Sequence, residues 1–351
     1  MARDLRIEPG TGTSIGGTRA GMSSSDRLLR WGSRNARMLA PMTTLLTMIV
    51  FFSLVTDTFL RTRNLQNIVT QIGPVAVAAA GITFVLLCAE IDLSIASVAT
   101  LAGIFAAYFW VGSWIDLGIW GILVAALIAA AIGLINGLFV SYVGIPSFMM
   151  TLAMLTIAHG LSVFVTQGRP IFEAPDLLRY LGGAGNRVLG IPVIGLFALA
   201  ILLVSDLVLS YTKFGRYVYM TGGNREAAEM SGVNTKQVIA MSLMICGLTA
   251  GISGMLAVGR LSQANPSAGG DLLISAIAAV VLGGTSLFGG EGGIKNTLLG
   301  LLIFGVLSNG LNLLPNISIY FKEALQGIIL VAALLLNVVA LRLERVQVRT
   351  E

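Results

Sequence analysis

The stretch YTKFGRYVYMTGGNREAAEMSGVNTK, residues 211–236, is a polar island between two apolar runs at about 192–211 and 237–258. Each run is close to the roughly 20 residues that a helix needs to cross about 30 Å of hydrocarbon. The runs therefore predict membrane-spanning helices. The island between them predicts a connection that lies at a membrane surface.

A short helix with both ends marked is expected in the middle of the island. Asn224 can cap the first free amide groups, Glu226 suits the positive first turn, and Gly232 can supply a left-handed stop. A helix of about two turns cannot bury a core of its own. Its exposed Glu and Ala faces are better explained by docking, which indicates a membrane subunit driven by a soluble partner.

The composition extends this reading to the whole chain. Its residues are 56% hydrophobic and only 11% charged, whereas a soluble domain carries roughly a quarter charged residues. The fold class expected is all-α, a polytopic membrane protein with about ten transmembrane helices. The spans are expected at about 41–60, 73–90, 94–112, 117–140, 147–166, 192–211, 237–258, 273–288, 296–314 and 323–341.

Two of these spans look least like simple helices. The second runs into Glu90 and Asp92, and the eighth ends in Gly-rich sequence, so a broken or partly re-entrant segment is the alternative for both. The domain organisation expected is a disordered cytoplasmic tail at 1–36, a transmembrane domain at 37–342 and a short cytoplasmic tail at 343–351. The cytoplasmic loop at about 212–236 belongs to the transmembrane domain.

Positive charge predicts the orientation in the membrane. With both termini inside, fifteen of the 22 Lys and Arg residues fall on the cytoplasmic side and seven on the outside. Such an excess favours an even number of spans with both ends in the cytoplasm. Because the basic residues lie beside membrane ends, lipid and not nucleic acid is the expected neighbour. The polar island is then on the side where ATP is found.

Several motifs carry a structural and a functional reading. Gly247, Gly251, Gly254 and Ala257 form a small-residue stripe, which more often serves helix packing than transport. Asp92, within Glu90-Ile91-Asp92-Leu93-Ser94, suits a cap for the next helix or the lining of a pathway, and both readings stay open.

No resident cofactor or metal is expected. The Gly-rich stretch at 283–293 lacks the residues of a phosphate-binding loop and is interpreted as a flexible turn, so ATP is expected to bind another chain. His159 is the only histidine, and Cys88 and Cys246 lie in apolar runs. The cysteines fit small buried hydrophobic residues better than a disulfide or metal site, and His159 fits a hydrogen bond between helices better than a catalytic set. The chain is therefore not expected to be an enzyme.

Taken together, the motifs resemble a known family. They are Phe214-Gly215-Arg216, the run from Gly223 to Ala228 with Gly232, the run from Ala276 to Ser286, Ile91 to Ser94, Asn136-Gly137, Pro146-Ser147-Phe148 with Thr151-Leu152, and Asn309-Gly310-Leu311. In this order and spacing they resemble the permease subunits of bacterial ABC sugar importers of the ribose, arabinose, xylose and galactose type. The resemblance covers about residues 40–340.

The resemblance implies a set of partners and sites. The partners are a cytoplasmic ATP-binding-cassette ATPase, a periplasmic or extracellular solute-binding protein, and a second permease chain, most simply an identical one, in the bacterial inner membrane. The implied ATPase-coupling residues are Gly223, Asn224, Arg225, Glu226, Ala227, Ala228 and Gly232. Candidates for lining the translocation pathway are Asp92, Ser94, Asn136, Phe148 and Thr285.

The function expected is therefore translocation of a monosaccharide or similar polyol delivered by the binding protein. An ion-coupled secondary transporter is the alternative, because such proteins also use intramembrane carboxylates such as Asp92 and Asp206. An intramembrane enzyme has the least support. Which sugar is carried does not follow from these residues.

Overall fold

A computed structural model of the chain describes residues 36–335, apart from 112–114, 268, 316–317, 319–320, 323, 330 and 333–334. The expected tails, 1–36 and 343–351, lie outside the described residues except for Ala36. Most of the tenth expected span, 323–341, lies outside them as well.

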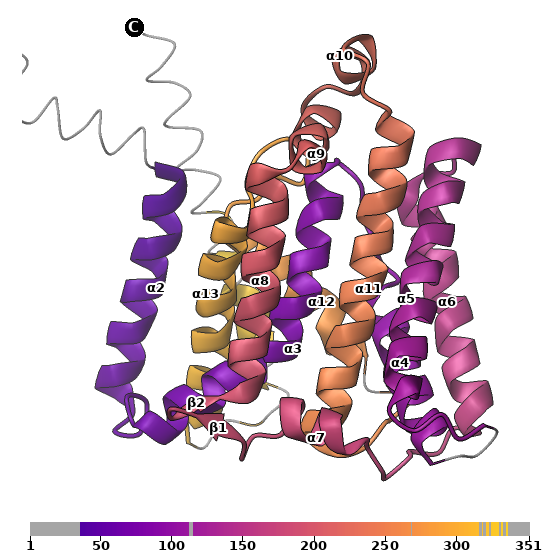
Figure 1. Ribbon diagram of the computed structural model, residues 1–351. Helices are drawn as coiled ribbons and strands as arrows, with labels where there is room; N and C mark the ends of the chain where they lie inside the picture. The colour runs from indigo at the N-terminus through magenta and orange to yellow at the C-terminus, as the bar shows by residue number, and fades with distance from the viewer. Residues whose placement is uncertain are drawn as a thin grey trace, which may run out of the picture.

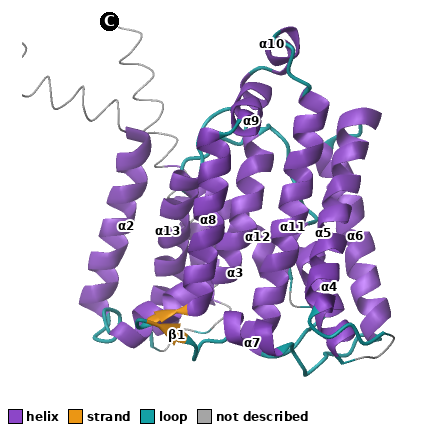
Figure 2. Cartoon of the chain, in the orientation of Figure 1, coloured by secondary structure: helices purple, strands orange, loops and turns teal. Residues whose placement is uncertain are grey.

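The described chain is almost entirely helical (Figures 1 and 2). One two-residue hairpin, β1 (Arg187–Val188) with β2 (Ile191–Pro192), is the only sheet among the described residues. The longer helices are α2 (Ala36–Val55), α3 (Thr62–Leu87), α4 (Ile95–Trp110), α5 (Trp120–Leu138), α6 (Ser147–Thr166), α8 (Val193–Tyr211), α11 (Thr235–Leu261), α12 (Gly270–Leu282) and α13 (Ile294–Leu313). The shorter ones are the π-helical turn η1 (Phe139–Val143), α7 (Asp176–Gly182), α9 (Lys213–Gly223) and α10 (Arg225–Met230).

The polytopic fold class is confirmed. Among the described residues, six helices are long and apolar enough to cross a membrane: α3, α5 with its η1 extension, α6, α8, α11 and α13. Three shorter apolar helices, Pro41–Val55, Ile95–Trp110 and Gly270–Leu282, occupy the positions of the first, third and eighth expected spans. All nine run side by side in one bundle (Figure 1).

Burial divides the bundle into a centre and a periphery. The buried share of the apolar window is 78% in α3 and 72% in α11, but only 28% in α6 and 33% in α8. Accordingly, α11 packs against α3, α4 and α5, while α6 and α8 expose large apolar side chains such as Phe164 and Leu203. Hydrocarbon chains are the natural surroundings of such exposed apolar faces.

Small residues explain why the central helices lie so close together. A Cβ added to Gly247 would lie 2.4 Å from the carbonyl oxygen of Ala129 on α5, and one added to Gly254 would lie 1.8 Å from that of Ala99 on α4. Gly251 faces the methyl groups of Ala129 and Ala102. Ala257, one turn further on, is half-buried. The stripe on α11 thus allows the backbones of α4 and α5 to pack directly against the backbone of α11.

The irregular segments lie near, but not at, the expected places. The second span is one continuous helix, α3, although Pro74 lies inside it. The interruption comes after it, where residues 88–94 are mostly non-helical and α4 then has only 16 residues. The eighth span, α12, has only 13 residues and ends before the Gly-rich loop at 283–293. Short helices of this kind leave backbone that must be satisfied within the protein.

The two ends of the bundle carry different structures. α9 and α10 project from one end (Figure 1). The helix α7 and the β1–β2 hairpin cover the opposite end (Figures 1 and 2). α11 runs the whole length between them, since it begins beside α10 and ends near α7.

Candidate functional site

The polar island folds into two helices, of which the sequence predicted only the second. α9 begins after Thr212, whose hydroxyl oxygen accepts a hydrogen bond from the Gly215 amide at 3.1 Å. The apolar side of α9 packs on the bundle through Phe214, which stacks on Phe84 of α3, and through Val218, which is fully buried. The cap at Thr212 and the spacing between Phe214 and Val218 were the signals for this helix.

α10 has the expected caps at both ends. The Asn224 side-chain oxygen accepts a hydrogen bond from the Ala227 amide at 3.0 Å, and Gly232 has a φ of +82°. Ala228 points inward and is 1% exposed, whereas Glu226 and Ala227 are exposed. Met230 is 91% exposed. A helix of six residues that presents an acidic, a small and a large apolar side chain outward is a protruding contact surface.

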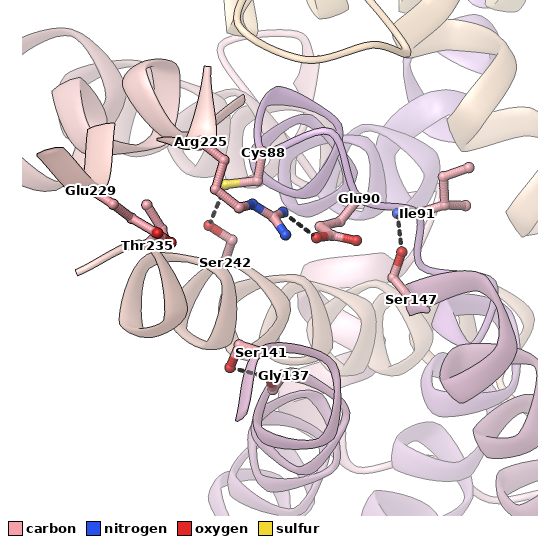
Figure 3. Close-up of polar contacts among 10 residues, drawn as sticks. All are labelled: Cys88, Glu90, Ile91, Gly137, Ser141, Ser147, Arg225, Glu229, Thr235 and Ser242. Carbon is pink, nitrogen blue, oxygen red and sulfur yellow. Dashed lines mark hydrogen bonds and ion pairs between the residues drawn. The ribbon is translucent and has the colours of Figure 1, made fainter. Parts of the chain in front are cut away.

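An ion pair joins α10 to the chain beyond α3 (Figure 3). The Arg225 guanidinium donates to the Glu90 carboxylate, with Nη2 and Oε1 separated by 2.6 Å. The Arg225 side chain is 47% exposed, but that of Glu90 is only 11% exposed. On the other side of α10, the Thr235 hydroxyl donates to Glu229 at 2.5 Å, which ties α10 to the first turn of α11.

Glu90 belongs to the non-helical segment 88–94, and this segment is bonded to the bundle on several sides. The Cys88 sulfur and the Ser242 hydroxyl on α11 are 3.3 Å apart (Figure 3). The Ile91 amide donates to the Ser147 hydroxyl at 3.1 Å, and the Leu93 amide donates to Thr151 at 3.0 Å. Both acceptors lie on α6. Side chains therefore satisfy backbone amides that no helix satisfies here.

The same segment contains a buried polar cluster. The Asp92 carboxylate accepts hydrogen bonds from the Ser94 amide at 2.8 Å and the Ser94 hydroxyl at 2.6 Å. Asn136 on α5 donates to the Ser94 hydroxyl at 3.1 Å, while its own side-chain oxygen has no partner among the described residues. Asp92, Ser94 and Asn136 are each less than 5% exposed. The cluster links the start of α4 to α5.

The Gly-rich loop after α12 is ordered against α9 and α3. The Gly290 amide donates to the Leu87 carbonyl at 3.0 Å, and the Tyr219 hydroxyl donates to the Gly292 carbonyl at 2.9 Å. Burial, with a smaller effect from the negative charge of Asp206, raises the pKa of Tyr219, so its phenol remains a donor at neutral pH. A Cβ on Gly222 would lie only 1.7 Å from the Leu87 carbonyl oxygen. The backbones of α9, of the end of α3 and of this loop are thus in direct contact with one another.

Comparison with known proteins decides what kind of membrane protein this is. Residues 64–334 match the family described as "Branched-chain amino acid transport system / permease component". The chain belongs to this permease family.

Individual relatives agree with the family match. The ribose import permease protein RbsC of Escherichia coli K12 is 37% identical over 84% of this chain and 91% of its own length. The D-allose transport system permease protein AlsC of the same organism is 32% identical over 82% of this chain and 87% of its own length. The probable ABC transporter permease protein YphD, also from that organism, is 31% identical over 89% of this chain and 92% of its own length.

These findings confirm the resemblance to permease subunits of ribose-type ABC importers. The chain is the permease component of such an importer and not the enzyme that hydrolyses ATP. An importer of this class implies an ATPase and a solute-binding protein as partners. The match decides against an ion-coupled secondary transporter and against an intramembrane enzyme.

The residues that the resemblance proposed for the permease do not all lie together. Asp92, Ser94 and Asn136 form the buried cluster described above. Phe148 lies on α6 and is 48% exposed on the outside of the bundle. Thr285 lies in the Gly-rich loop, where its hydroxyl oxygen accepts a hydrogen bond from the Gly293 amide at 3.3 Å. They therefore occupy three separate environments.

The residues proposed for coupling, by contrast, are contiguous. Gly223 ends α9, Asn224 caps α10, and Arg225 to Ala228 form most of α10. What the sequence did not reveal is the partner of Arg225, because Glu90 is 135 positions away and no local pattern pairs the two. The contact of Tyr219 with the Gly-rich loop was missed for the same reason.

Proposed function

We propose that this permease carries a monosaccharide or similar polyol into a bacterial cell. The proposal rests on the relatives, because the names of two of them specify ribose and D-allose. A pentose and a hexose are thereby both represented, so the proposal names the class of solute and not one sugar. In this scheme the solute-binding protein outside the membrane selects the sugar. Contacts within the permease can then be few and weak.

We further propose that α10 is the surface on which the cytoplasmic ATPase docks. The single observation that carries this is the exposure of Glu226, Ala227 and Met230 on a capped helix that protrudes from the bundle. A helix of six residues is too short to be stable through its own hydrogen bonds. Here it is held by the Asn224 cap and by its contacts with α9 and α11. A force that the ATPase applies to α10 would therefore be passed on to these two helices.

Movement of α10 has a defined route into the bundle. Arg225 holds Glu90, and the segment 88–94 continues to the cluster of Asp92, Ser94 and Asn136. When ATP closes the two ATPase subunits, α10 would shift and this segment would shift with it. Alternating access needs two states of similar energy that partners can bias. The interrupted helix between α3 and α4 is a suitable place for such a change.

The five candidate pathway residues would contribute to transport in three different ways. Asp92, Ser94 and Asn136 are enclosed, so they would meet the solute only after the segment 88–94 moves. Thr285 would act through the position of the Gly-rich loop. Phe148 lies on the outer face of α6 and would act through a neighbouring chain.

The orientation and assembly follow from the same scheme. α10 must face the cytoplasm, which agrees with the excess of Lys and Arg that places both termini on that side. A second permease chain, most simply an identical copy, would complete the pore over two ATPase subunits. Native mass spectrometry of the purified complex measures this directly, because two copies of a 36.8 kDa chain are expected.

The experiment that tests the docking surface is the substitution Glu226→Lys. The change reverses the charge at the tip of α10, where no other described side chain depends on Glu226, so insertion into the membrane should be retained. We expect ATP-dependent uptake of labelled ribose and allose to be abolished in cells that carry this variant. The tagged variant should also fail to retain the ATPase on purification from the membrane.

The matched control is Asp57→Lys, the same reversal of charge at an exposed residue on the opposite end of the bundle. This variant should retain the ATPase as the unmodified chain does. Normal uptake by Glu226→Lys at an equal amount of protein in the membrane would refute the docking assignment.

A further inference from the structure

A cavity lined by both apolar and polar side chains lies among the central helices, away from α10. It is bounded by α3, α4, α11, α12 and the turn that joins the last two. Its volume is about 200 Å³. Seven polar side chains line it: Gln71, Thr100, Arg260, Gln263, Asn265, Asp271 and Ser275. None of the functional assignments made above uses these residues.

The cavity lies where two short helices begin. α4 has 16 residues and α12 has 13, and the first two turns of α12 and the second turn of α4 contribute to the lining. Gly269, just before α12, lies against Ala96 and Thr100 of α4, so the two helix starts are close in space. Interrupted helices that begin inside a membrane bundle are where transporters build solute sites, because their free backbone groups and nearby cavities remain hydrated.

The side chains of the lining are free to bind a ligand. With other described residues, the side chains of Gln71, Arg260, Asp271 and Ser275 form no hydrogen bond or ion pair. Thr100 donates its hydroxyl hydrogen to the Ala96 carbonyl and keeps its lone pairs. Asn265 accepts from the Ser267 amide and keeps its amino group. Donors and acceptors therefore both face the cavity.

The charges of the lining select for a neutral ligand. Arg260 and Asp271 contribute one positive and one negative charge, so the site as a whole is balanced. A phosphorylated solute would meet Asp271 without a second cation, and a free cation would meet Arg260. Hydroxyl groups both donate and accept hydrogen bonds, so a polyol matches carboxylate, amide, guanidinium and hydroxyl partners together.

The size of the cavity points to a single sugar ring. A water molecule occupies about 30 Å³ of liquid, so the cavity holds roughly six or seven waters. It is smaller than the roughly 300–1,000 Å³ of pockets that enclose drug-sized ligands. Gly254 and Ala257 of the small-residue stripe help to keep this space open, because larger side chains there would fill it.

We propose that this cavity is a transient binding site for the monosaccharide on its way through the permease. The inference rests on the proposed function and deepens it, since it names residues that would contact the sugar. The cavity lies toward the end of α11 that is distant from α10 (Figure 1). In the proposed orientation this is the outer half of the membrane. A sugar released by the binding protein would therefore reach this site before it reaches the segment 88–94.

The test uses the complex purified through the tagged permease and reconstituted in vesicles, with ATP enclosed and the solute-binding protein added outside. Uptake of radiolabelled D-ribose and D-allose by the unmodified complex tests the proposed function itself. The substitution Ser275→Leu then places a large apolar side chain in the cavity. Uptake per complex should fall at least about tenfold, which corresponds to about 1.4 kcal/mol. The matched control, Ser210→Leu at an exposed position on α8, should stay within about twofold of the unmodified complex.

A second measurement does not depend on transport. Cys88 and Cys246 are both fully buried, so the unmodified chain should react little with a polar thiol reagent. The variant Ser275→Cys should react, and saturating ribose or allose should slow the reaction at least about threefold. Sucrose at the same osmotic strength should not, because two rings exceed the cavity.

The outcomes separate the two proposals. If the unmodified complex takes up none of a panel of pentoses, hexoses and sugar alcohols that includes these two sugars, the proposed function fails, whatever the variants do. If it transports one of them, uptake by Ser275→Leu within twofold of the unmodified complex overturns the cavity site. Should Ser275→Leu fail to assemble, the thiol reaction decides. Modification of Ser275→Cys that no sugar transported by the unmodified complex slows would equally overturn the site.

Discussion

At the scale of single residues, the pair Arg225 and Glu90 brings together a half-exposed cation and a nearly buried carboxylate. The two partners are not equivalent. Solvent screens Arg225, so the attraction alone contributes little to stability. Glu90, however, has little access to water, and loss of its partner leaves a charged acceptor poorly solvated. Replacement of Arg225 should therefore cost more than the strength of an exposed ion pair.

A charge-swap series tests this pair. Arg225→Glu and Glu90→Arg each place like charges together, and each should reduce the free energy of unfolding by about 1–3 kcal/mol. The double variant restores opposite charges and should recover half or more of that loss. The measurement is thermal unfolding of the purified permease in detergent, together with ATP-dependent uptake. Losses that simply add in the double variant would show that the two residues act independently.

At the scale of elements, Gly222 and Gly223 at the end of α9 offer a matched pair of adjacent positions. An added Cβ on Gly222 would collide with the Leu87 carbonyl oxygen at 1.7 Å, while one on Gly223 meets nothing within 4 Å. Neither glycine has a positive φ. The contrast therefore isolates the close approach of α9 to α3 from the conformational freedom of glycine.

Gly222→Ala should push α9 away from the end of α3 and from the Gly-rich loop. We expect a loss of about 1–3 kcal/mol in unfolding free energy, as is typical of an overpacked site. Gly223→Ala should leave the thermal midpoint unchanged or slightly higher. An equal midpoint for both variants would contradict the backbone contact at Gly222.

The stripe on α11 supports a second comparison between helices. Gly254→Ala places a Cβ 1.8 Å from the Ala99 carbonyl oxygen, whereas a Cβ on Gly160 of α6 meets nothing within 4 Å. Gly254→Ala should lower the thermal midpoint because α4 and α11 must separate. Gly160→Ala should keep it or raise it, since alanine stabilises a helix by about 0.5–1 kcal/mol relative to glycine. A decrease for Gly160→Ala as large as that for Gly254→Ala would argue against a role of the stripe in close approach.

At the scale of the whole molecule, apolar length and end signals predict most of the bundle. The fifth expected span coincides with α6, and the sixth begins one residue before α8. The second was placed at 73–90, but α3 begins at Thr62. The polar residues of its first turns, Arg63, Asn64 and Gln66, hid this start. Asn64 is buried, and its side-chain amide donates hydrogen bonds to the Phe59 carbonyl and to the Asn309 side chain. Only the folded bundle supplies these contacts.

The candidate site, too, contains features that local sequence predicts and features that only the tertiary structure creates. The caps of α10 are local, so Asn224 and Gly232 revealed them. The pair of Arg225 with Glu90 and the cavity between α3, α4, α11 and α12 are products of tertiary structure. Gln71, Thr100 and Asp271 are unremarkable in their own segments, and only the arrangement of four helices places them around one space.

The orientation of the whole chain can be tested with two single-cysteine positions at opposite ends of the bundle. Glu226 lies on α10, and Leu189 lies in the hairpin at the other end, where it is 97% exposed. The distribution of Lys and Arg places α10 in the cytoplasm and the hairpin outside. In intact spheroplasts, a membrane-impermeant thiol reagent should therefore modify Leu189→Cys but not Glu226→Cys. After permeabilisation both should react, while the unmodified chain, with two buried cysteines, is the background control. Reaction of Glu226→Cys in intact spheroplasts would invert the topology, and α10 could then not be the ATPase contact.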